Sequence, residues 1–180
     1  MIYPENKDLF MVLTCLLLVI LLWACFSRAR AERVVKCHDG DTCTIQTKEG
    51  KYSLRLWGID APEIKQPYGV KSREYLKKLV LNKRVKVVLT GSGSWGRKVG
   101  RLYVGRKDVC SEMVKLGLAW DSPKYSKGKY SHQQNSAQKK RRGLWKDSNS
   151  QPPWDYRAGK RRKPKRRKGF LQRCFGWLSA

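Results

Sequence analysis

Alternating apolar and polar residues in the first third of the sequence predict β-strands. Successive side chains of a strand point to opposite faces, so every second apolar side chain can pack on a core. This pattern occurs at residues 34–37, 43–45 and 54–58. Asp39-Gly40-Asp41 separates the first two segments, and a glycine flanked by aspartates is typical of a tight turn. We therefore predict a hairpin followed by a third strand.

The later part of the sequence contains both helical and strand patterns. Residues 70–81 carry apolar side chains on one stripe of a helix, and residues 84–89 and 100–104 predict two more strands. A further helix is predicted at 108–116, where an aspartate can cap the first turn. The last is predicted at 131–141, where serine and a glutamine three residues later fit a capping box. Together these elements predict a mainly β domain with about three helices.

Acidic residues lie where two of the predicted strands end. Asp39 and Asp41 are in the first turn, and Asp60 and Glu63 follow the strand that carries Arg55. Carboxylates that gather in one place repel one another, so such a cluster usually indicates a bound cation or a catalytic role. The alternative interpretation is a pair of solvated acidic turns.

Four motifs follow one another along the chain. They are Asp-Gly-Asp-Thr at 39–42, R-x4-D-x-P-E at 55–63, Gly96-Arg97, and the segment 113–120. In order and spacing they resemble the staphylococcal nuclease (thermonuclease) family, and the resemblance runs over residues 34–154. It implies a five-stranded Greek-key barrel of the OB type, in an α+β chain of the membrane-anchored or exported bacterial kind.

The resemblance also implies a calcium-dependent phosphodiesterase. Asp41 and Asp60 would bind Ca²⁺, with the main-chain carbonyl of Ala61 as a third ligand and Asp39 acting through water. The family often has threonine where this chain has Ala61, and a main-chain ligand should tolerate that change. Glu63 would position or deprotonate the attacking water.

Two arginines and two aromatic residues complete the implied site. Arg55 and Arg97 would hold the phosphate, because the planar guanidinium offers several donors and is always charged. Trp95 stands where the family commonly has tyrosine and would stack on a base or sugar, and Tyr125 would add an aromatic contact. The products would be 3′-phosphate mononucleotides and oligonucleotides from DNA and RNA, with little sequence selectivity.

The charge of the chain supports a polyanionic partner. The net charge is +26, and residues 32–150 alone contain 27 Lys and Arg against 11 Asp and Glu. Such an excess favours binding to nucleic acid or to an anionic membrane surface. Seven Trp and 41% hydrophobic residues argue for a folded core rather than disorder. No protein partner is inferred, and we expect a monomer.

The N-terminal region contains an uncharged apolar segment, Leu9–Phe26. At about 1.5 Å per residue its 18 residues just reach across a hydrocarbon layer of about 30 Å. We predict an uncleaved single-pass anchor, and the alternative is a signal peptide cleaved near Ala31. The basic residues after the segment favour a cytoplasmic domain. A calcium-dependent nuclease there would lack its metal and threaten the genome, so we expect the domain on the exported, periplasmic or extracellular, side.

The composition changes again near the C-terminus. The Pro-Pro-Trp segment at 152–154 predicts an ordered strap or linker, and Lys160–Lys168 is basic at eight of nine positions. Apolar residues at helical spacing follow, so residues 160–178 are typical of an interfacial membrane segment, the alternative being a disordered tail. An alternative function is therefore a membrane-tethered protein that captures nucleic acid. We divide the chain into an N-terminal segment, a nuclease domain and a C-terminal region, at 1–31, 32–147 and 148–180.

Cys37 and Cys43 flank the first turn symmetrically. Across a hairpin they would face each other, and they would be able to form a disulfide if the domain is exported. In a reducing compartment they would be ordinary strand residues. Both alternatives are open at this point.

Overall fold

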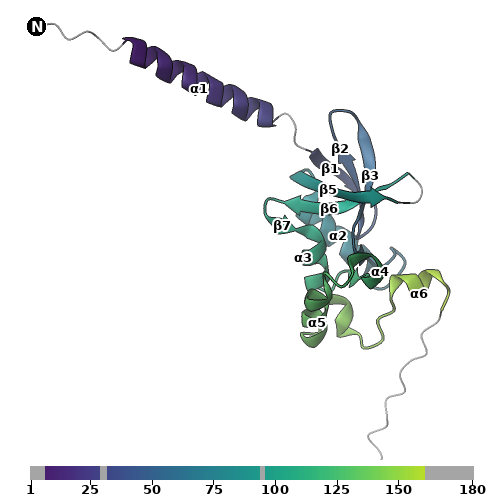
Figure 1. Cartoon of the computed structure of the whole chain (residues 1–180). Helices are drawn as coiled ribbons and strands as arrows, with labels where there is room; N and C mark the ends of the chain where they lie inside the picture. Colours follow the sequence, from purple (N-terminus) through teal and green to yellow (C-terminus); the bar gives the residue numbers. More distant parts are fainter. Residues whose placement is uncertain (1–6, 29–31, 94–95, 161–180) are drawn as a thin grey trace, which may run out of the picture.

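A five-stranded barrel forms the centre of the molecule (Figure 1). The computed structural model describes residues 7–28, 32–93 and 96–160. The barrel strands are β1 (Glu32–Cys37), β2 (Thr42–Gln46), β3 (Lys51–Leu56), β5 (Arg84–Ser92) and β6 (Lys98–Val104). A sixth strand, β7 (Lys107–Asp108), pairs with β6, and the short strands β4 (Ile59–Asp60) and β8 (Trp120–Asp121) pair with each other.

The helices lie outside this barrel. They are α1 (Lys7–Arg28), α2 (Gly69–Val80), α3 (Val109–Lys115), α4 (Pro123–Ser126), α5 (Ser131–Lys139), the 3-10 helix η1 (Gly143–Lys146) and α6 (Pro153–Arg157). Among the described residues, α2, α3 and α5 match the three helices predicted after residue 69. The chain therefore has the predicted combination of a β-barrel with helices packed around it.

A parallel pair of strands closes the barrel. Antiparallel pairs run in the order β3-β2-β1-β5-β6, and β3 then pairs with β6, with Leu54 opposite Lys98 and Leu56 opposite Gly100. On its other side, Gly100 packs against β5. A Cβ atom at Gly100 would lie 2.7 Å from the carbonyl oxygen of Val88, so only glycine allows the backbones of β5 and β6 to approach this closely. The closed sheet confirms the predicted five-stranded OB-type barrel.

The core fills the barrel and continues under the helices. Apolar side chains of the strands meet those of α2 and α3, and the fully buried ones include Val34, Ile45, Leu54, Leu56, Leu102, Leu76, Val80 and Met113. These are the alternating residues of the predicted strands and the apolar stripe of the predicted helix. Hydrophobic burial on this scale fixes the barrel wall from which the polar residues described below project.

The predicted hairpin is present, and its two cysteines face each other. Cys37 pairs with Cys43 across β1 and β2, and the two Sγ atoms are 3.4 Å apart. Both are buried free thiols in this structure. The hydrogen bond between the thiols lowers the pKa of Cys37, and the same contact together with burial raises the pKa of Cys43.

One predicted helix cap is confirmed and another is wrong. The side chain of Asp108 accepts a hydrogen bond from the amide of Ser111 at 3.2 Å and caps α3, as predicted. Helix α5 has Tyr130 as its N-cap residue, without a side-chain cap. The side chain of Gln134 instead accepts from the amide of Asp121 at 2.9 Å, because β8 brings that unpaired amide beside the helix.

The N-terminal helix α1 lies apart from the barrel in Figure 1. Within the ranges that the structure describes, no helix combines the length and the apolar character needed to cross a membrane. The anchor predicted at residues 9–26 is therefore not confirmed. The membrane segment predicted at 160–178 lies outside the described residues except for Lys160.

The C-terminal strap, residues 148–160, returns to the barrel domain. The Trp154 ring contacts Trp120 edge-on, with ring centroids 5.7 Å apart, and Trp120 contacts Trp145 in the same way at 4.3 Å. The main-chain oxygen of Gln151 accepts a hydrogen bond from Gln66 at 2.6 Å. The contacts of Gln151 and Trp154 cross the domain boundary predicted after residue 147.

Candidate active site

The turn between β1 and β2 places Asp41 against the barrel wall. Gly40 lies against Ser72 of α2 so closely that a Cβ atom would collide with that hydroxyl group. The Asp39 side chain accepts from the amide of Asp41 at 2.9 Å, as in an Asx turn. The next residue, Thr42, lies opposite Arg55 in the β2–β3 register. Local turn chemistry and strand pairing therefore bring Asp41 beside Arg55.

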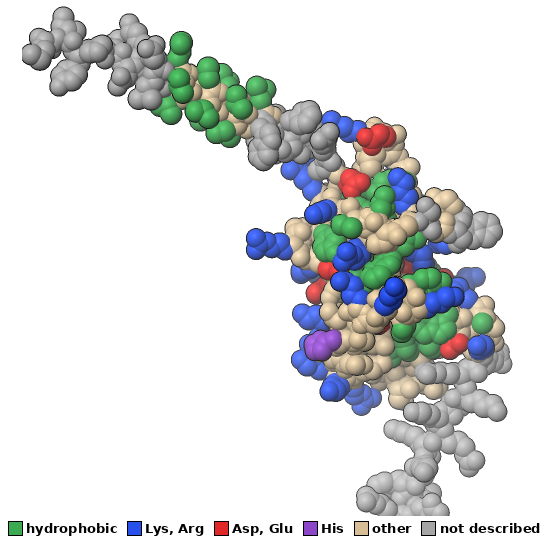
Figure 2. Space-filling model, in the orientation of Figure 1, with side chains coloured by type: hydrophobic (Ala, Val, Ile, Leu, Met, Phe, Trp, Pro, Cys, Tyr) green, Lys and Arg blue, Asp and Glu red, His purple; other side chains and the backbone are tan. Residues whose placement is uncertain are grey.

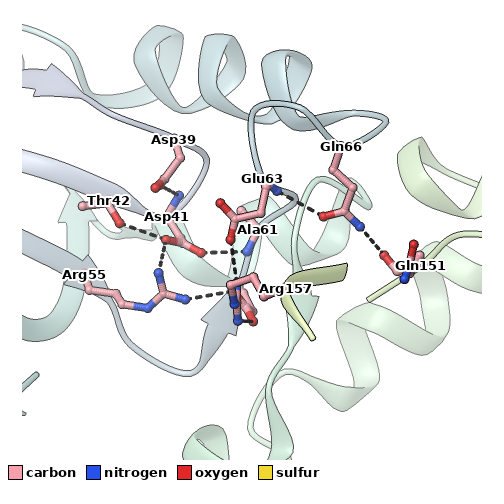
Figure 3. Close-up of polar contacts among 10 residues, drawn as sticks. Asp39, Asp41, Thr42, Arg55, Ala61, Glu63, Gln66, Gln151 and Arg157 are labelled. Carbon is pink, nitrogen blue, oxygen red and sulfur yellow. Dashed lines mark hydrogen bonds and ion pairs between the residues drawn. The ribbon is translucent and has the colours of Figure 1, made fainter. Parts of the chain in front are cut away.

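Asp41 is buried, and both of its carboxylate oxygens accept hydrogen bonds. It is 2% exposed, and its carboxylate accepts from the Thr42 hydroxyl at 3.0 Å, from Arg55 at 2.7 Å and from the amide of Ala61 at 2.7 Å (Figure 3). Burial raises the pKa of Asp41 to about 8, although Arg55 opposes this shift. A buried acid with a raised pKa is one that a cation would stabilise strongly in its ionised form.

Arg55 connects the two buried acids. Its Nη1 donates to Asp41 at 2.7 Å and its Nη2 donates to Asp60 at 2.8 Å. Burial acts to lower the pKa of Arg55, but the carboxylates of Asp41 and Asp60 outweigh it, and the pKa is raised. The guanidinium is therefore charged, and it brings Asp41 and Asp60 to one point.

Glu63 lies on the loop that follows β4. Its amide donates to the Gln66 side chain at 3.2 Å, and the other end of that side chain donates to the main chain of Gln151. Gln66 is 5% exposed, so this link between the Glu63 loop and the C-terminal strap is shielded from water. The Glu63 side chain itself is 38% exposed.

Arg157 is the site residue that the sequence did not predict. It lies in α6, and its Nη2 donates to Asp60 Oδ2 at 2.7 Å while Nη1 donates to Glu63 at 2.7 Å and to Asp60 Oδ1 at 3.2 Å. Figure 3 shows Arg157 reaching the acids from the side opposite Arg55. The chain contains 40 Lys and Arg residues, and nothing in the sequence distinguishes Arg157 from the others as a site residue.

These residues line an open pocket of about 750 Å³. The residues lining it include Asp39, Arg55, Asp60, Glu63, Arg97, Tyr125 and Arg157. The structure thus brings the predicted site residues together around one hollow, with the buried Asp41 directly behind it. Trp95 lies outside the described residues.

The ligands that the resemblance implies are oxygen atoms, the kind that a hard cation such as Ca²⁺ takes. Asp41 and Asp60 contact the same guanidinium, so their carboxylate oxygens converge, and oxygen atoms are the ligands that Ca²⁺ prefers. Within residues 32–93 and 96–160, no cluster of three or more His, Cys, Asp or Glu side chains has metal-binding geometry. The predicted set uses two side chains and one main-chain carbonyl, so water and substrate oxygens would complete the coordination.

The surface of the barrel domain is basic. Figure 2 shows Lys and Arg side chains scattered over the visible face of the barrel domain, with fewer acidic side chains among them. Some of these cations lie over aromatic rings, such as Lys98 over Tyr52 at 4.3 Å and Arg101 over Trp57 at 5.9 Å. Positive charge interleaved with aromatic rings is suited to a nucleic-acid strand.

One family model and several known proteins are similar to this chain. The model described as "Staphylococcal nuclease homologue" matches residues 53–147. A protein of Haemophilus influenzae named as an uncharacterized endonuclease is 40% identical over 149 residues, which is 81% of this chain and 84% of that protein. A protein of the same name from Escherichia coli O157:H7 is 36% identical over 147 residues, 81% of this chain and 96% of its own length.

A plant relative matches over the domain alone. A staphylococcal-like nuclease of Arabidopsis thaliana is 42% identical over 112 residues, which is 62% of this chain and 35% of that protein. The range matched by the family model includes Arg55, Asp60 and Glu63. Asp41 precedes that range and Arg157 follows it.

Proposed function

This chain belongs to the staphylococcal nuclease family and is a hydrolytic nuclease, and we propose that it cleaves DNA and RNA in a calcium-dependent reaction. The observation that supports this proposal best is the convergence of Asp41 and Asp60 on Arg55 at the base of the pocket that Glu63 and Arg97 line. Phosphodiester hydrolysis requires a cation, an oriented water and positive charge near the phosphate. This pocket offers residues for each requirement.

The buried half of the pocket would hold the metal. Asp41 and Asp60 would bind Ca²⁺ together with the main-chain carbonyl of Ala61, and Asp39 would act through a water molecule. Calcium, when bound, supplies positive charge to the nonbridging phosphate oxygens. The barrel wall keeps the two carboxylates in place, because both are 5% exposed or less.

The exposed half of the pocket would act on the substrate. Glu63 would orient the attacking water and accept its proton, which requires the Glu63 carboxylate to be ionised. Arg55 and Arg97 would contact the phosphate from two sides and stabilise its growing negative charge in the transition state. Tyr125, which is 62% exposed on the pocket rim, and Trp95 would stack on bases or sugars.

Substrate choice would follow charge rather than sequence. Contacts to phosphate carry no sequence information and weaken with added salt. The +26 net charge and the basic face in Figure 2 favour this mode of binding. We therefore propose that DNA and RNA are both substrates and that the products carry 3′-phosphates, as the family resemblance implies.

The decisive experiment separates an enzyme from a nucleic-acid-capturing protein. Purified protein is incubated with plasmid DNA at fixed salt, with calcium or with a calcium chelator, and cleavage and binding are measured side by side. We expect chelation to abolish cleavage and to leave binding in place, because phosphate contacts by Lys and Arg do not need the metal. Cleavage that continues at full rate under chelation would refute the calcium dependence, and binding without any cleavage would favour the capture function.

A further inference from the structure

Arg157 forms ion pairs with the acidic residues that the proposed reaction needs. Its guanidinium contacts both oxygens of Asp60, at 2.7 and 3.2 Å, and one oxygen of Glu63 at 2.7 Å. Asp60 Oδ1 also accepts from Arg55, so two guanidinium groups share this carboxylate. The oxygens that would ligate calcium and the carboxylate that would activate water are thus paired with a side chain of the protein itself.

Arg157 and a divalent cation would compete for Asp60. Each carboxylate oxygen has about two lone-pair positions, and on Oδ1 of Asp60 both are taken by the two arginines. A cation bound to Oδ2 would lie a few ångströms from the Arg157 guanidinium, at a distance where two positive charges repel strongly. Binding of a cation at Oδ2 would therefore weaken or break the Arg157 contact.

Arg157 can move away from Asp60 more easily than Arg55 can. The Arg55 side chain is 28% exposed and belongs to the barrel strand β3, whereas the Arg157 side chain is 45% exposed and belongs to the five-residue helix α6. The strap keeps Arg157 near the pocket through Gln151 and Trp154, which contact Gln66 and Trp120. Arg157 can thus move off the acids and return without unfolding the barrel.

We propose that Arg157 is a built-in competitor of the metal, which holds Asp60 and Glu63 in the cation-free enzyme and is displaced when calcium binds. This inference rests on the calcium site of the proposed function. It assigns the C-terminal strap a regulatory role, because any change that moves the strap changes the calcium concentration at which the site fills. A static structural ion pair would instead stay intact when calcium binds, so the two models differ in whether the Arg157 contact survives in the calcium-bound form.

Calcium affinity of the full chain tests this proposal directly. Wild-type protein, Arg157→Ala and Lys160→Ala are freed of calcium and titrated with calcium chloride in a calorimeter, without nucleic acid. Lys160→Ala is the matched control, since it removes a positive charge from the same strap, where the Lys160 ammonium lies 3.7 Å from Asp155. If the arginine-bound form is about 90% populated, Arg157→Ala lowers the calcium Kd about tenfold. The control should leave the Kd within about twofold of wild type, because an exposed charge is screened.

A second measurement gives an independent readout. The melting temperature of each protein is compared in chelator and in saturating calcium. Arg157→Ala should lower the melting temperature only in chelator, because the contact exists only in the cation-free form. Equal losses under both conditions would indicate a static ion pair and overturn the proposal.

The outcomes distinguish failure of this inference from failure of the proposed function. If wild type binds calcium and Arg157→Ala binds it no more tightly, the competitor role is wrong while the calcium site stands. The same conclusion follows if Lys160→Ala tightens binding as much as Arg157→Ala does. If neither wild type nor Arg157→Ala binds calcium, the calcium site and the competitor role both fall.

Discussion

The two halves of the active site are built in different ways. Asp41 and Asp60 lie in the barrel wall and are 2% and 5% exposed. The side chains of Glu63 and Arg157 belong to a loop and to the strap, and are 38% and 45% exposed. Strand register and hydrogen bonds fix the first pair, whereas a water-screened ion pair holds the second. The comparison indicates a rigid half that defines where a cation binds and an adjustable half that decides when the site is ready.

The largest loss of activity is expected from a substitution in the rigid half, at the buried Asp41. Asp41→Asn preserves the size of the side chain and one oxygen acceptor, but it removes the negative charge on which the proposed cation depends. We expect a loss of about 10³-fold or more in kcat/KM, since a metal contributes several kcal/mol to catalysis. Plasmid cleavage across a calcium titration measures it, and full activity at ordinary calcium concentrations would refute the site.

Asparagine is a better test than alanine at this position. The sequence alone suggests that acids which repel one another are dispensable for folding. In the structure Asp41 accepts hydrogen bonds from the Ala61 amide and from Arg55. Arg55 would keep Asp60, but alanine would leave the buried Ala61 amide without a partner, at a cost of about 1–3 kcal/mol, whereas asparagine can still accept from it through Oδ1. Circular dichroism of Asp41→Asn would show whether the fold is kept.

A smaller loss of activity is expected from a substitution in the adjustable half, at Glu63. Glu63→Gln retains the shape of the side chain and loses the base, so kcat should fall by about 10²-fold or more. Calcium should still bind, because the proposed ligands are unaltered, and it should bind somewhat more tightly because Arg157 loses its charged partner Glu63. Steady-state kinetics on a short oligonucleotide separate kcat from KM. A change confined to KM would assign Glu63 to substrate docking and would remove the functional contrast between the two halves.

The smallest effect is expected where the strap meets the domain. Trp154→Ala removes the edge-on contact with Trp120, and such aromatic pairs contribute about 1 kcal/mol. We expect the melting temperature to fall by about 2–4 °C and activity to stay within about threefold. Tyr156→Ala is a suitable control, since this ring is 37% exposed in the same helix. A complete loss of activity in Trp154→Ala would show that the reaction requires the docked strap, and would contradict the view that the strap only adjusts the site.

The contact between Asp41 and Arg55 in the rigid half could be predicted from the sequence, because it depends on segments that follow one another along the chain. The Asp-Gly-Asp turn lies between two alternating segments, and Arg55 follows on the next strand, so hairpin geometry alone brings Asp41 and Arg55 together. The strands followed from the same alternation, and the family resemblance implied that they close into a barrel. Resemblance to the family then supplied the roles of Glu63 and Arg97, which no local pattern indicates.

Arg157 and the strap contacts of the adjustable half could not be predicted, because they join distant parts of the chain. Gln66 and Gln151 are 85 residues apart in sequence, and nothing in their local pattern marks either as a contact residue. The capping box predicted at Ser131 is absent for a similar reason, since the Gln134 side chain accepts a hydrogen bond from the amide of Asp121 instead. Tertiary hydrogen bonds of this kind override the local rule that predicted the cap.

The strap also sets the order in which the site is completed during synthesis. Arg157 enters the growing polypeptide 94 residues after Glu63. At a translation rate of about 5–20 residues per second, the ribosome needs roughly 5 to 20 s to add the intervening chain. The acids therefore leave the ribosome before the guanidinium that pairs with them. A nascent or prematurely terminated chain that ends before residue 157 would carry the barrel with Asp60 paired to Arg55 alone and Glu63 without its ion pair.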